Sequence, residues 1–285
     1  MKVSECMQSD VIHVVVPGTR EDVLHLMAEQ QINGVPVCKK GTKTLVGMIT
    51  RSDLLRKPDE NQIGMLMVRD PVTVTPRTEV KTAAKTIMEK GFRRLPVVDK
   101  DNLVGLVSIP DILGAVLEND DKSQKASIMP YVNKQIVAVW SETPLPLSYM
   151  IMEMAGKTSL VVLNDGGGIA GMISVSDYLR LSEVQIEDNI SKTYSGEESA
   201  VEWGWTSKDF LVVTKKLLQL PQVPVKDVMT KNLINVSEVM SVADCVRILR
   251  KNDIDQAPVV SASGSLIGMI EDKDLLKLAF ESLDS

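Results

Sequence analysis

The sequence has few of the residues that build disulfide frameworks or metal sites. Its 285 residues include three cysteines and two histidines, and Cys6, Cys38 and Cys245 form no C-x-x-C pair. An odd number of widely spaced cysteines argues against a disulfide framework and against a structural zinc site, so we expect reduced, partly buried thiols. His13 and His25 have no ligand at metal spacing and no visible nucleophile partner, which argues against metal binding and catalysis by either.

Long apolar runs and a net positive charge are also missing. No apolar run approaches the roughly 20 residues of a membrane-spanning helix, and the opening MKVSECMQSD lacks the apolar core of a signal peptide. The net charge of −6 at pH 7 provides no general attraction for nucleic acid or anionic lipid. We therefore expect a cytoplasmic protein that binds neither nucleic acid nor membrane.

What the sequence does contain is one unit in four copies. The aligned stretches are 35–55, 95–113, 160–179 and 257–276. In each, a glycine lies six residues before an aspartate: Gly47 and Asp53, Gly105 and Asp111, Gly171 and Asp177, Gly268 and Asp274. Three copies carry a proline at the second position (Pro36, Pro96, Pro258), where the third copy has Val161. Such self-similarity indicates a repeat architecture.

The segments upstream of these stretches match as well. Residues 3–14, 63–74 and 225–236 resemble one another, and 127–139 is a longer, weaker version. Methionines recur in them (Met7, Met67, Met129, Met229), which we interpret as adaptable packing residues.

Between the two kinds of segment, apolar residues recur at helical spacing, over 20–31, 79–91, 146–156 and 241–252. Gly91 and Gly156 lie where helix C-caps favour glycine. Each unit thus reads strand, helix, strand, turn, strand, helix. A unit of this size is too small to bury both faces alone, so we expect the repeats to pair.

These matches divide the chain into repeat 1 (1–60), repeat 2 (61–122), repeat 3 (123–182), an insertion (183–222) and repeat 4 (223–285). The insertion is acidic first, then aromatic, then apolar at helical spacing. We interpret it as a partly ordered segment that packs Trp203, Trp205 or Phe210 on the body. The alternative is a docking surface, because exposed aromatic residues mark interfaces.

The segments GMITRSD (47–53), GLVSIPD (105–111), GMISVSD (171–177) and the imperfect GMIEDKD (268–274) resemble the CBS domain family. The resemblance covers nearly the whole chain apart from the insertion, and the chain is similar to stand-alone archaeal proteins with four CBS repeats. It implies a mixed α/β fold of four β-α-β-β-α repeats in two tandem pairs, repeat 1 with 2 and repeat 3 with 4. The pairs would form a flat disc with pseudo-fourfold symmetry, within one chain or through a homodimer.

In this family, clefts between paired repeats bind adenosyl ligands such as AMP, ADP, ATP or S-adenosylmethionine. The resemblance places the ribose on the aspartates Asp53, Asp111, Asp177 and Asp274. It places the phosphate near Thr50, Ser108 and Ser174, with Arg93 and Arg94 as further donors, and the adenine near Gly34, Val35, Leu95 and Ala257. Chemically, a carboxylate accepts two adjacent hydroxyls in a fork, and a hydroxyl at a helix start meets phosphate together with free N–H groups.

A structural alternative stays open at each junction. Ser/Thr followed three residues later by an acid is also a helix capping box. In repeat 4, Glu271 replaces the hydroxyl residue although Asp274 remains, which favours a ligand role, but Asp272 offers a way to rebuild a cap. Arg93 and Arg94 have a simpler explanation as solvated residues at a strand start.

The four clefts are not expected to be equivalent. Asp255 and Glu271 bring negative charge to the fourth, where it would repel a phosphate but not a cation. Our hypothesis is that the N-terminal pair favours nucleotide phosphates, while the fourth site is empty or takes a sulfonium such as S-adenosylmethionine.

The function expected from these features is that of a regulatory adenosyl-ligand sensor that alters an unidentified partner protein. The alternative is a ligand-independent interaction scaffold. An enzyme is not expected, because no acid/base or metal constellation is left outside the repeats, and no catalytic cofactor is implied. GGGIAG (166–171) satisfies a dinucleotide-binding pattern, but the repeat alignment places it in a hairpin, so we reject that function.

Overall fold

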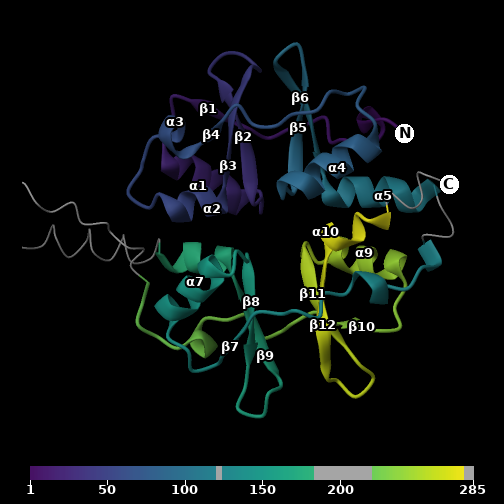
Figure 1. The fold of residues 1–285 in the computed structure, drawn as a ribbon. Coiled ribbons are helices and arrows are strands. Elements are labelled where there is room, and N and C mark those ends of the chain that lie inside the picture. Colours follow the sequence, from purple (N-terminus) through teal and green to yellow (C-terminus); the bar gives the residue numbers. More distant parts are fainter. Residues whose placement is uncertain (120–123, 183–219, 279–285) are drawn as a thin grey trace, which may run out of the picture.

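The structure, a computed structural model, describes residues 1–119, 124–182 and 220–278. Four β-α-β-β-α repeats surround a common centre in a rounded, disc-like body (Figure 1). The predicted fold class is confirmed. Trp203, Trp205 and Phe210 lie outside the described residues, as does most of the insertion. Within the described part of the chain, no helix is both long and apolar enough to cross a membrane.

The first two repeats contain the following elements. Repeat 1 consists of η1 (Val3–Glu5), β1 (Val14–Val16), α1 (Arg20–Glu29), β2 (Gly34–Lys39), β3 (Leu45–Thr50) and α2 (Arg51–Arg56). Repeat 2 consists of α3 (Ile63–Leu66), β4 (Val68–Arg69), α4 (Val80–Lys90), β5 (Arg94–Asp99), β6 (Asn102–Ser108) and α5 (Ile109–Asn119). Gly91 ends α4 in the left-handed conformation, with φ 68°, as the sequence predicts.

The last two repeats follow the same order. Repeat 3 consists of η2 (Met129–Tyr131), β7 (Ala138–Trp140), α7 (Leu145–Met154), β8 (Ser159–Leu163), β9 (Ile169–Ser174) and a helix over 175–182. Repeat 4 consists of η3 (Val225–Asp227), β10 (Val236–Ser237), α9 (Val242–Lys251), β11 (Gln256–Val260), β12 (Leu266–Glu271) and α10 (Asp272–Leu275). Gly156, with φ 61°, follows the end of α7, and GGGIAG forms the β8–β9 hairpin, as predicted.

Strand register shows that the repeats are structurally equivalent. In repeats 1, 3 and 4 the first strand is parallel to the second, with Val14 opposite Val37, Val139 opposite Val162 and Val236 opposite Val259. In repeat 2 this contact is reduced to one bridge, Val74 to Val97. The second and third strands form an antiparallel hairpin in every repeat. Positions aligned by sequence are therefore equivalent in space.

Paired repeats exchange the segments that precede their first strands. Gln8, from the start of repeat 1, pairs with Leu106 of repeat 2, while Val68 pairs back with Met48 of repeat 1. In the second half, Asn133 pairs with Met269 of repeat 4, and Thr230 pairs with Met172 of repeat 3. Hydrogen bonds thus join repeat 1 to 2 and repeat 3 to 4, the predicted pairs. The exchange itself is not visible in the sequence.

The glycine of each repeat makes room for the exchanged segment. A Cβ added at Gly47, Gly105 or Gly171 would lie 2.6, 2.6 or 2.7 Å from the sulfur of a methionine, respectively Met67, Met7 and Met229. These three methionines therefore pack where the sequence predicts.

In the fourth contact, the corresponding place is not occupied by a methionine. At Gly268 the added atom would meet Val132 Cγ1 at 2.7 Å and the carbonyl oxygen of Asn133 at 2.5 Å. Met129 is three residues away from that contact, because the segment before β7 carries valine at the equivalent position.

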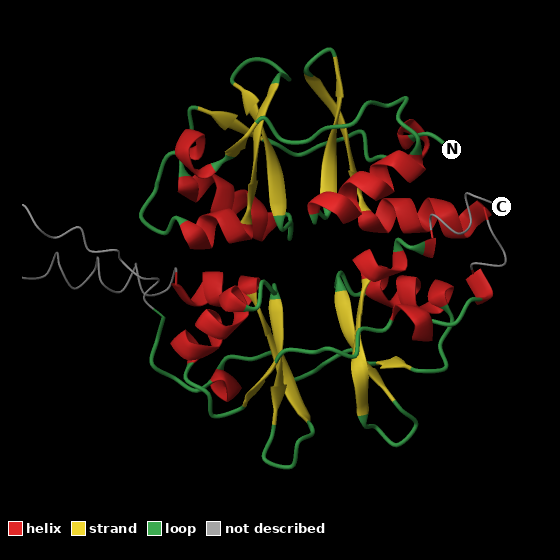
Figure 2. Cartoon of the chain, viewed as in Figure 1, coloured by secondary structure: helices red, strands yellow, loops and turns green. Residues whose placement is uncertain are grey.

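Two hydrophobic cores join the pairs to each other. In Figure 2 the helices of the two halves face one another across the middle of the body, and the hairpins point outward. Ile112 of α5 shares a core with Leu249 of α9 and Leu275 of α10. Leu54 of α2 shares the other core with Tyr178 of repeat 3. Repeat 2 therefore faces repeat 4, repeat 1 faces repeat 3, and the strand-to-helix junctions point toward the middle.

Candidate ligand sites at the strand-to-helix junctions

At three of the four junctions the aspartate binds the hydroxyl residue that starts the closing helix, and Thr50 with Asp53 forms a complete capping box. Oδ2 of Asp53 accepts hydrogen bonds from the backbone N–H and the hydroxyl of Thr50, at 2.9 and 2.6 Å. Asp111 does the same with Ser108 at 2.8 and 2.5 Å, and Asp177 with Ser174 at 2.9 and 2.9 Å. Each hydroxyl residue begins a helix, so the sequence pattern does stabilise helix N-termini. These hydrogen bonds all go to one carboxylate oxygen, Oδ2, of each aspartate.

In two of these aspartates, the second oxygen accepts a hydrogen bond from an exposed side chain. Oδ1 of Asp111 accepts from Gln8 Nε2 at 3.2 Å, and Oδ1 of Asp177 accepts from Arg180 Nη2 at 3.3 Å. Both bonds are long and solvent-exposed, so a ligand hydroxyl can replace either donor at small cost. Capping and ribose binding are thus compatible on one carboxylate.

The fourth junction has no capping box. Glu271 is the N-cap residue of α10 but makes no side-chain cap; it contacts Lys273 Nζ at 2.5 Å instead. Asp272 does not rebuild the cap, contrary to the alternative offered by the sequence, because its side chain is only 3% exposed and contacts Arg93. Oδ2 of Asp274 is buried and has no hydrogen-bond partner within the described residues. Burial, followed by the nearby Glu271, raises the pKa of Asp274.

An open cleft with a cavity volume of about 70 Å³ lies beside this junction, between repeats 3 and 4. Its lining combines residues 133, 135–137, 156–159 and 161 of repeat 3 with Gln256, Met269, Glu271 and Lys273 of repeat 4. Asp274 lies close enough to Glu271, Lys273 and Lys157 of this lining to interact with their charges. The cleft thus brings polar and apolar side chains of two repeats together.

The charge of the cleft differs from the sequence-based expectation. Asp255 is not among its lining residues and lies 3.5 Å from Arg93. Glu271 does line it but is paired with Lys273, and Lys157 adds a second ammonium group. The argument that this site repels phosphate is therefore wrong, because the fold directs one acid elsewhere and neutralises the other.

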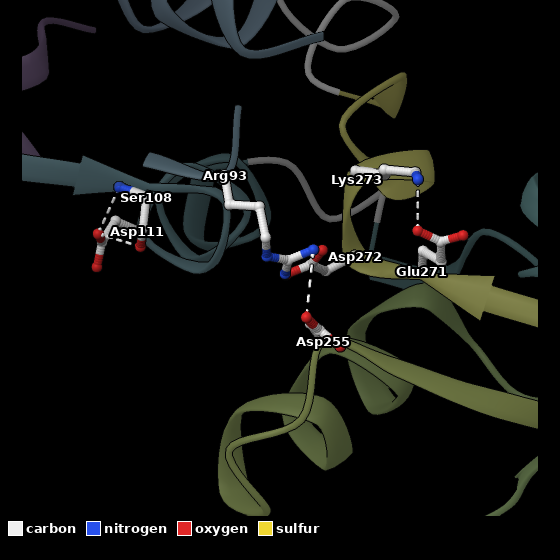
Figure 3. A network of polar contacts seen from close by, with 7 residues as sticks. All are labelled: Arg93, Ser108, Asp111, Asp255, Glu271, Asp272 and Lys273. Carbon is white, nitrogen blue, oxygen red and sulfur yellow. Dashed lines mark hydrogen bonds and ion pairs between the residues drawn. The ribbon is translucent and has the colours of Figure 1, made fainter. Parts of the chain in front are cut away.

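Arg93 and Arg94 both have protein partners. Arg93 Nη2 donates to Asp272 Oδ2 at 2.6 Å, and Figure 3 shows its side chain directed toward repeat 4 and away from Ser108 and Asp111. Arg94 Nη1 donates to the carbonyl of Gly34 at 3.2 Å. Burial, followed by the charge of Arg93, lowers the pKa of Arg94. Neither is a solvated arginine, and neither is directed at a serine hydroxyl in this structure.

The residues assigned to the adenine side lie at the starts of the middle strands. Val35, Leu95 and Ala257 are fully buried in the cores, so only their backbone groups are available to a ligand. Gly34 begins β2, and its carbonyl is bound by Arg94. Asn133, Lys157 and Lys273 line the cleft but were not predicted, because none belongs to a pattern shared by the repeats.

The described residues near these sites include no arrangement suited to metal binding, and their buried cysteines are packing groups. Across the residues with described positions, no cluster of histidine, cysteine, aspartate and glutamate is arranged to hold a metal. Cys38 and Cys245 are buried free thiols, and burial raises the pKa of Cys245 to about 12. A buried thiol with a raised pKa is a packing group rather than a nucleophile.

Sequence comparison identifies the class of protein. The CBS domain profile matches residues 3–60, 63–118 and 225–281, so the chain belongs to the CBS domain family. Repeat 3 has the same strand and helix order.

Similar proteins include whole-length and partial matches. MJ1225 from Methanocaldococcus jannaschii is 22% identical over 97% of this chain and 98% of its own length. Its crystal structure superposes with a TM-score of 0.79 at 21% identity, covering 97% of this chain and 99% of that one. A Pyrococcus horikoshii protein gives 0.64 at 25% identity, covering 98% and 99%.

Other matches are shorter. CBSX2, solved in complex with AMP, is 30% identical over 41% of this chain and 96% of that one, with a TM-score of 0.39. For several curated relatives the match spans only 42% to 61% of the relative's length. The fold is therefore shared along the chain, while the activities of those larger relatives are not carried over.

Proposed function

We propose that this protein is a regulatory module that binds an adenosyl ligand, of the AMP, ADP, ATP or S-adenosylmethionine class, in clefts between paired repeats. The observation that carries the proposal is the carboxylate of Asp274. It caps no helix, one of its oxygens is buried without a partner in the described chain, and it lies close enough to Lys157, Glu271 and Lys273 of the cleft lining to interact with their charges. A buried acceptor without a donor is destabilising, and a ribose diol supplies two donors.

The rest of the cleft suits the other parts of such a ligand. Ile136, Val137 and Met269 provide apolar surface for a base, while Lys157 provides charge for a phosphate and Lys273 balances Glu271. The same aspartate recurs at Asp53, Asp111 and Asp177 (by the repeat alignment), so three further sites are proposed with the hydroxyls of Thr50, Ser108 and Ser174 on the phosphate side.

The proposed mechanism is a shift between arrangements of the repeats. A ligand in the cleft touches both members of a pair, and it favours whichever arrangement gives it more contacts. A partner protein that binds the two arrangements differently then senses the ligand. The proposal includes a cytoplasmic location and a role without catalysis. The regulated protein is a partner that binds the two arrangements with different affinity.

The test is isothermal titration of the full chain with AMP, ADP, ATP, S-adenosylmethionine and methylthioadenosine. Asp274→Asn keeps the shape of the side chain but removes its charge, and we expect it to weaken one binding event by about 10- to 100-fold, the value of a charge-assisted hydrogen bond. Asp244→Asn is the control, an acid in the first turn of α9 that does not line the cleft. Failure of all five ligands to bind the unmodified chain would favour the scaffold alternative.

A further inference from the structure

Arg93 connects repeat 2 to repeat 4 across the contact between the two pairs. Its guanidinium donates to Asp272 at 2.6 Å and lies 3.5 Å from Asp255, as Figure 3 shows. We refer to Arg93, Asp255 and Asp272 as the Arg93 cluster. Asp272 stands between Glu271 and Lys273 in sequence, and both neighbours line the ligand cleft. The cluster therefore touches the helical turn that forms one wall of that cleft.

The backbone of Arg93 also contacts a junction. In every repeat, the carbonyl of the residue three positions before the aligned proline accepts from the first N–H of the closing helix. In repeat 2 this bond runs from Ile109 to Arg93 at 3.1 Å, and in repeat 4 it runs from Asp272 to Asp255 at 2.9 Å. Arg93 thus holds the start of α5 with its main chain and the start of α10 with its side chain.

The cluster occurs at only one of the two contacts between the pairs in the described structure. The positions equivalent to Arg93 and Asp255 are Asn33 in repeat 1 and Thr158 in repeat 3, which are uncharged. Where repeat 1 faces repeat 3, Arg51 occupies the place of Asp272 and donates to Ser176. The charged link is therefore specific to the side of the disc that carries Asp274.

The wall that Arg93 holds has little stability of its own. α10 is a helix of four residues whose N-cap makes no side-chain hydrogen bond, and a single helical turn is unstable in isolation. Asp272 is buried, and its Oδ1 has no partner among the described residues. Without Arg93, the buried carboxylate of Asp272 would lose its ion-pair partner at 2.6 Å. A buried charge without a partner is strongly unfavourable, so the turn would move toward solvent.

We propose that Arg93 is a positioning residue for the cleft of the second pair: it fixes the first turn of α10 through Asp272, and thereby places Glu271, Lys273 and Asp274. The statement about the turn stands on the structure alone, whereas its consequence for affinity rests on the proposed function. Because coupling is reciprocal, a ligand on this turn also acts on Arg93. The adjacent Arg94 binds the Gly34 carbonyl, which extends the link to repeat 1.

The first experiment needs no ligand. Hydrogen–deuterium exchange of the full chain is compared between the unmodified protein, Arg93→Ala and the control Arg247→Ala, which removes an exposed arginine paired with Asp244 on α9. We expect faster exchange over 268–278 in Arg93→Ala alone, with no change over the equivalent junction 47–56. Exchange over 268–278 equal to that of the unmodified protein would overturn the proposal.

The second experiment measures affinity for AMP and S-adenosylmethionine. The measured quantity is the affinity of the binding event that Asp274→Ala removes. We expect Arg93→Ala to weaken this binding on the order of tenfold, a typical coupling strength. Arg93 does not line the cleft, so such a loss would act through the turn. Arg93→Lys keeps the charge and should recover part of the loss, and it also serves as the test variant if Arg93→Ala does not fold. If neither ligand binds the unmodified chain, the proposed function fails while the exchange experiment still decides the role of Arg93. Unchanged affinity in both variants would contradict the coupling.

Discussion

The four aspartates of the repeats illustrate how one sequence position serves different physical purposes. Asp53, Asp111 and Asp177 each hold the first turn of a helix through one oxygen. Asp274 holds none, because Glu271 replaces the hydroxyl that would complete the box. A residue retained where its structural use has disappeared is better explained by something outside the chain, and this asymmetry separates ligand binding from capping.

A stability measurement distinguishes the two roles. Asp53→Ala or Asp177→Ala removes a cap and should lower the free energy of unfolding by about 1 kcal/mol. Asp274→Ala should not lower it, because its carboxylate is partly desolvated, lacks a partner for Oδ2 and has a raised pKa. Urea unfolding of the three variants without ligand checks this. Equal losses in all three would show that Asp274 is structural.

Asp272 gives a prediction about pH. Burial raises its pKa from 3.8 to about 6, against the lowering effect of Arg93 and with a further rise from Asp255. Arg94 is a further charged group near it, and the backbone N–H of Lys273 also lowers the pKa. Because the folded pKa lies above the unfolded one, the stability from this group is complete below pH 4 and is lost as the pH rises through 6. The loss amounts to about 3 kcal/mol at most.

Asp272→Asn is the corresponding variant, since it mimics the protonated carboxyl group at all pH values. We expect it to be at least as stable as the unmodified protein at pH 7.5 and to show a flatter stability profile between pH 4 and 6. Thermal unfolding across that range measures both. The control is Asp244→Asn, whose carboxylate is exposed and paired on its own helix; a profile unchanged in Asp272→Asn would contradict the assignment.

At the scale of elements, the exchanged segments determine how closely the repeats of a pair approach. A side chain at Gly268 would collide with the backbone oxygen of Asn133 at 2.5 Å, whereas at Gly47 the nearest atom, at 2.6 Å, belongs to the flexible Met67 side chain. We expect Gly268→Ala to destabilise the protein by about 1–3 kcal/mol and Gly47→Ala by less. Asn133 lines the cleft, so Gly268→Ala should also weaken ligand binding. Thermal unfolding and titration of both variants check the order; a larger effect at Gly47 would contradict it.

The elements themselves were predictable from the sequence, but their partners were not. Turn glycines such as Gly91, the helical spacing of apolar residues and the recurring glycine–aspartate pair are local signals, repeated four times. The segment around Gln8 has no such periodicity, and its partner Asp111 is 103 positions away. The partner of Arg93 is 179 positions away. The aspartates were found because they recur, whereas Lys157 and Lys273 were missed because only the fold brings them to one cleft.

At the scale of the whole molecule, each hydrophobic core extends across both pairs of repeats. Each core contains helices from both halves of the chain, so a pair by itself would expose the apolar faces of α5 or α9. A homodimer of one pair and a complex of the two different pairs would both bury these apolar faces. The Arg93 cluster distinguishes the mixed complex from the homodimers. Its cation belongs to the first half of the chain, whereas its anions, Asp255 and Asp272, belong to the second.

This division of charge predicts how separated halves assemble. When residues 1–122 and 123–285 are produced as two chains and mixed, we expect a 1:1 complex in preference to either homodimer, because only the mixed assembly neutralises Arg93, and a homodimer of the second half places buried carboxylates without a cation. Native mass spectrometry measures the proportions. Arg93→Asp in the first half should shift the mixture toward homodimers, while Arg77→Asp, at an exposed arginine before α4, should leave it unchanged. If the unmodified halves form homodimers as readily as the mixed complex, apolar burial alone determines the arrangement and the Arg93 cluster has no part in choosing it.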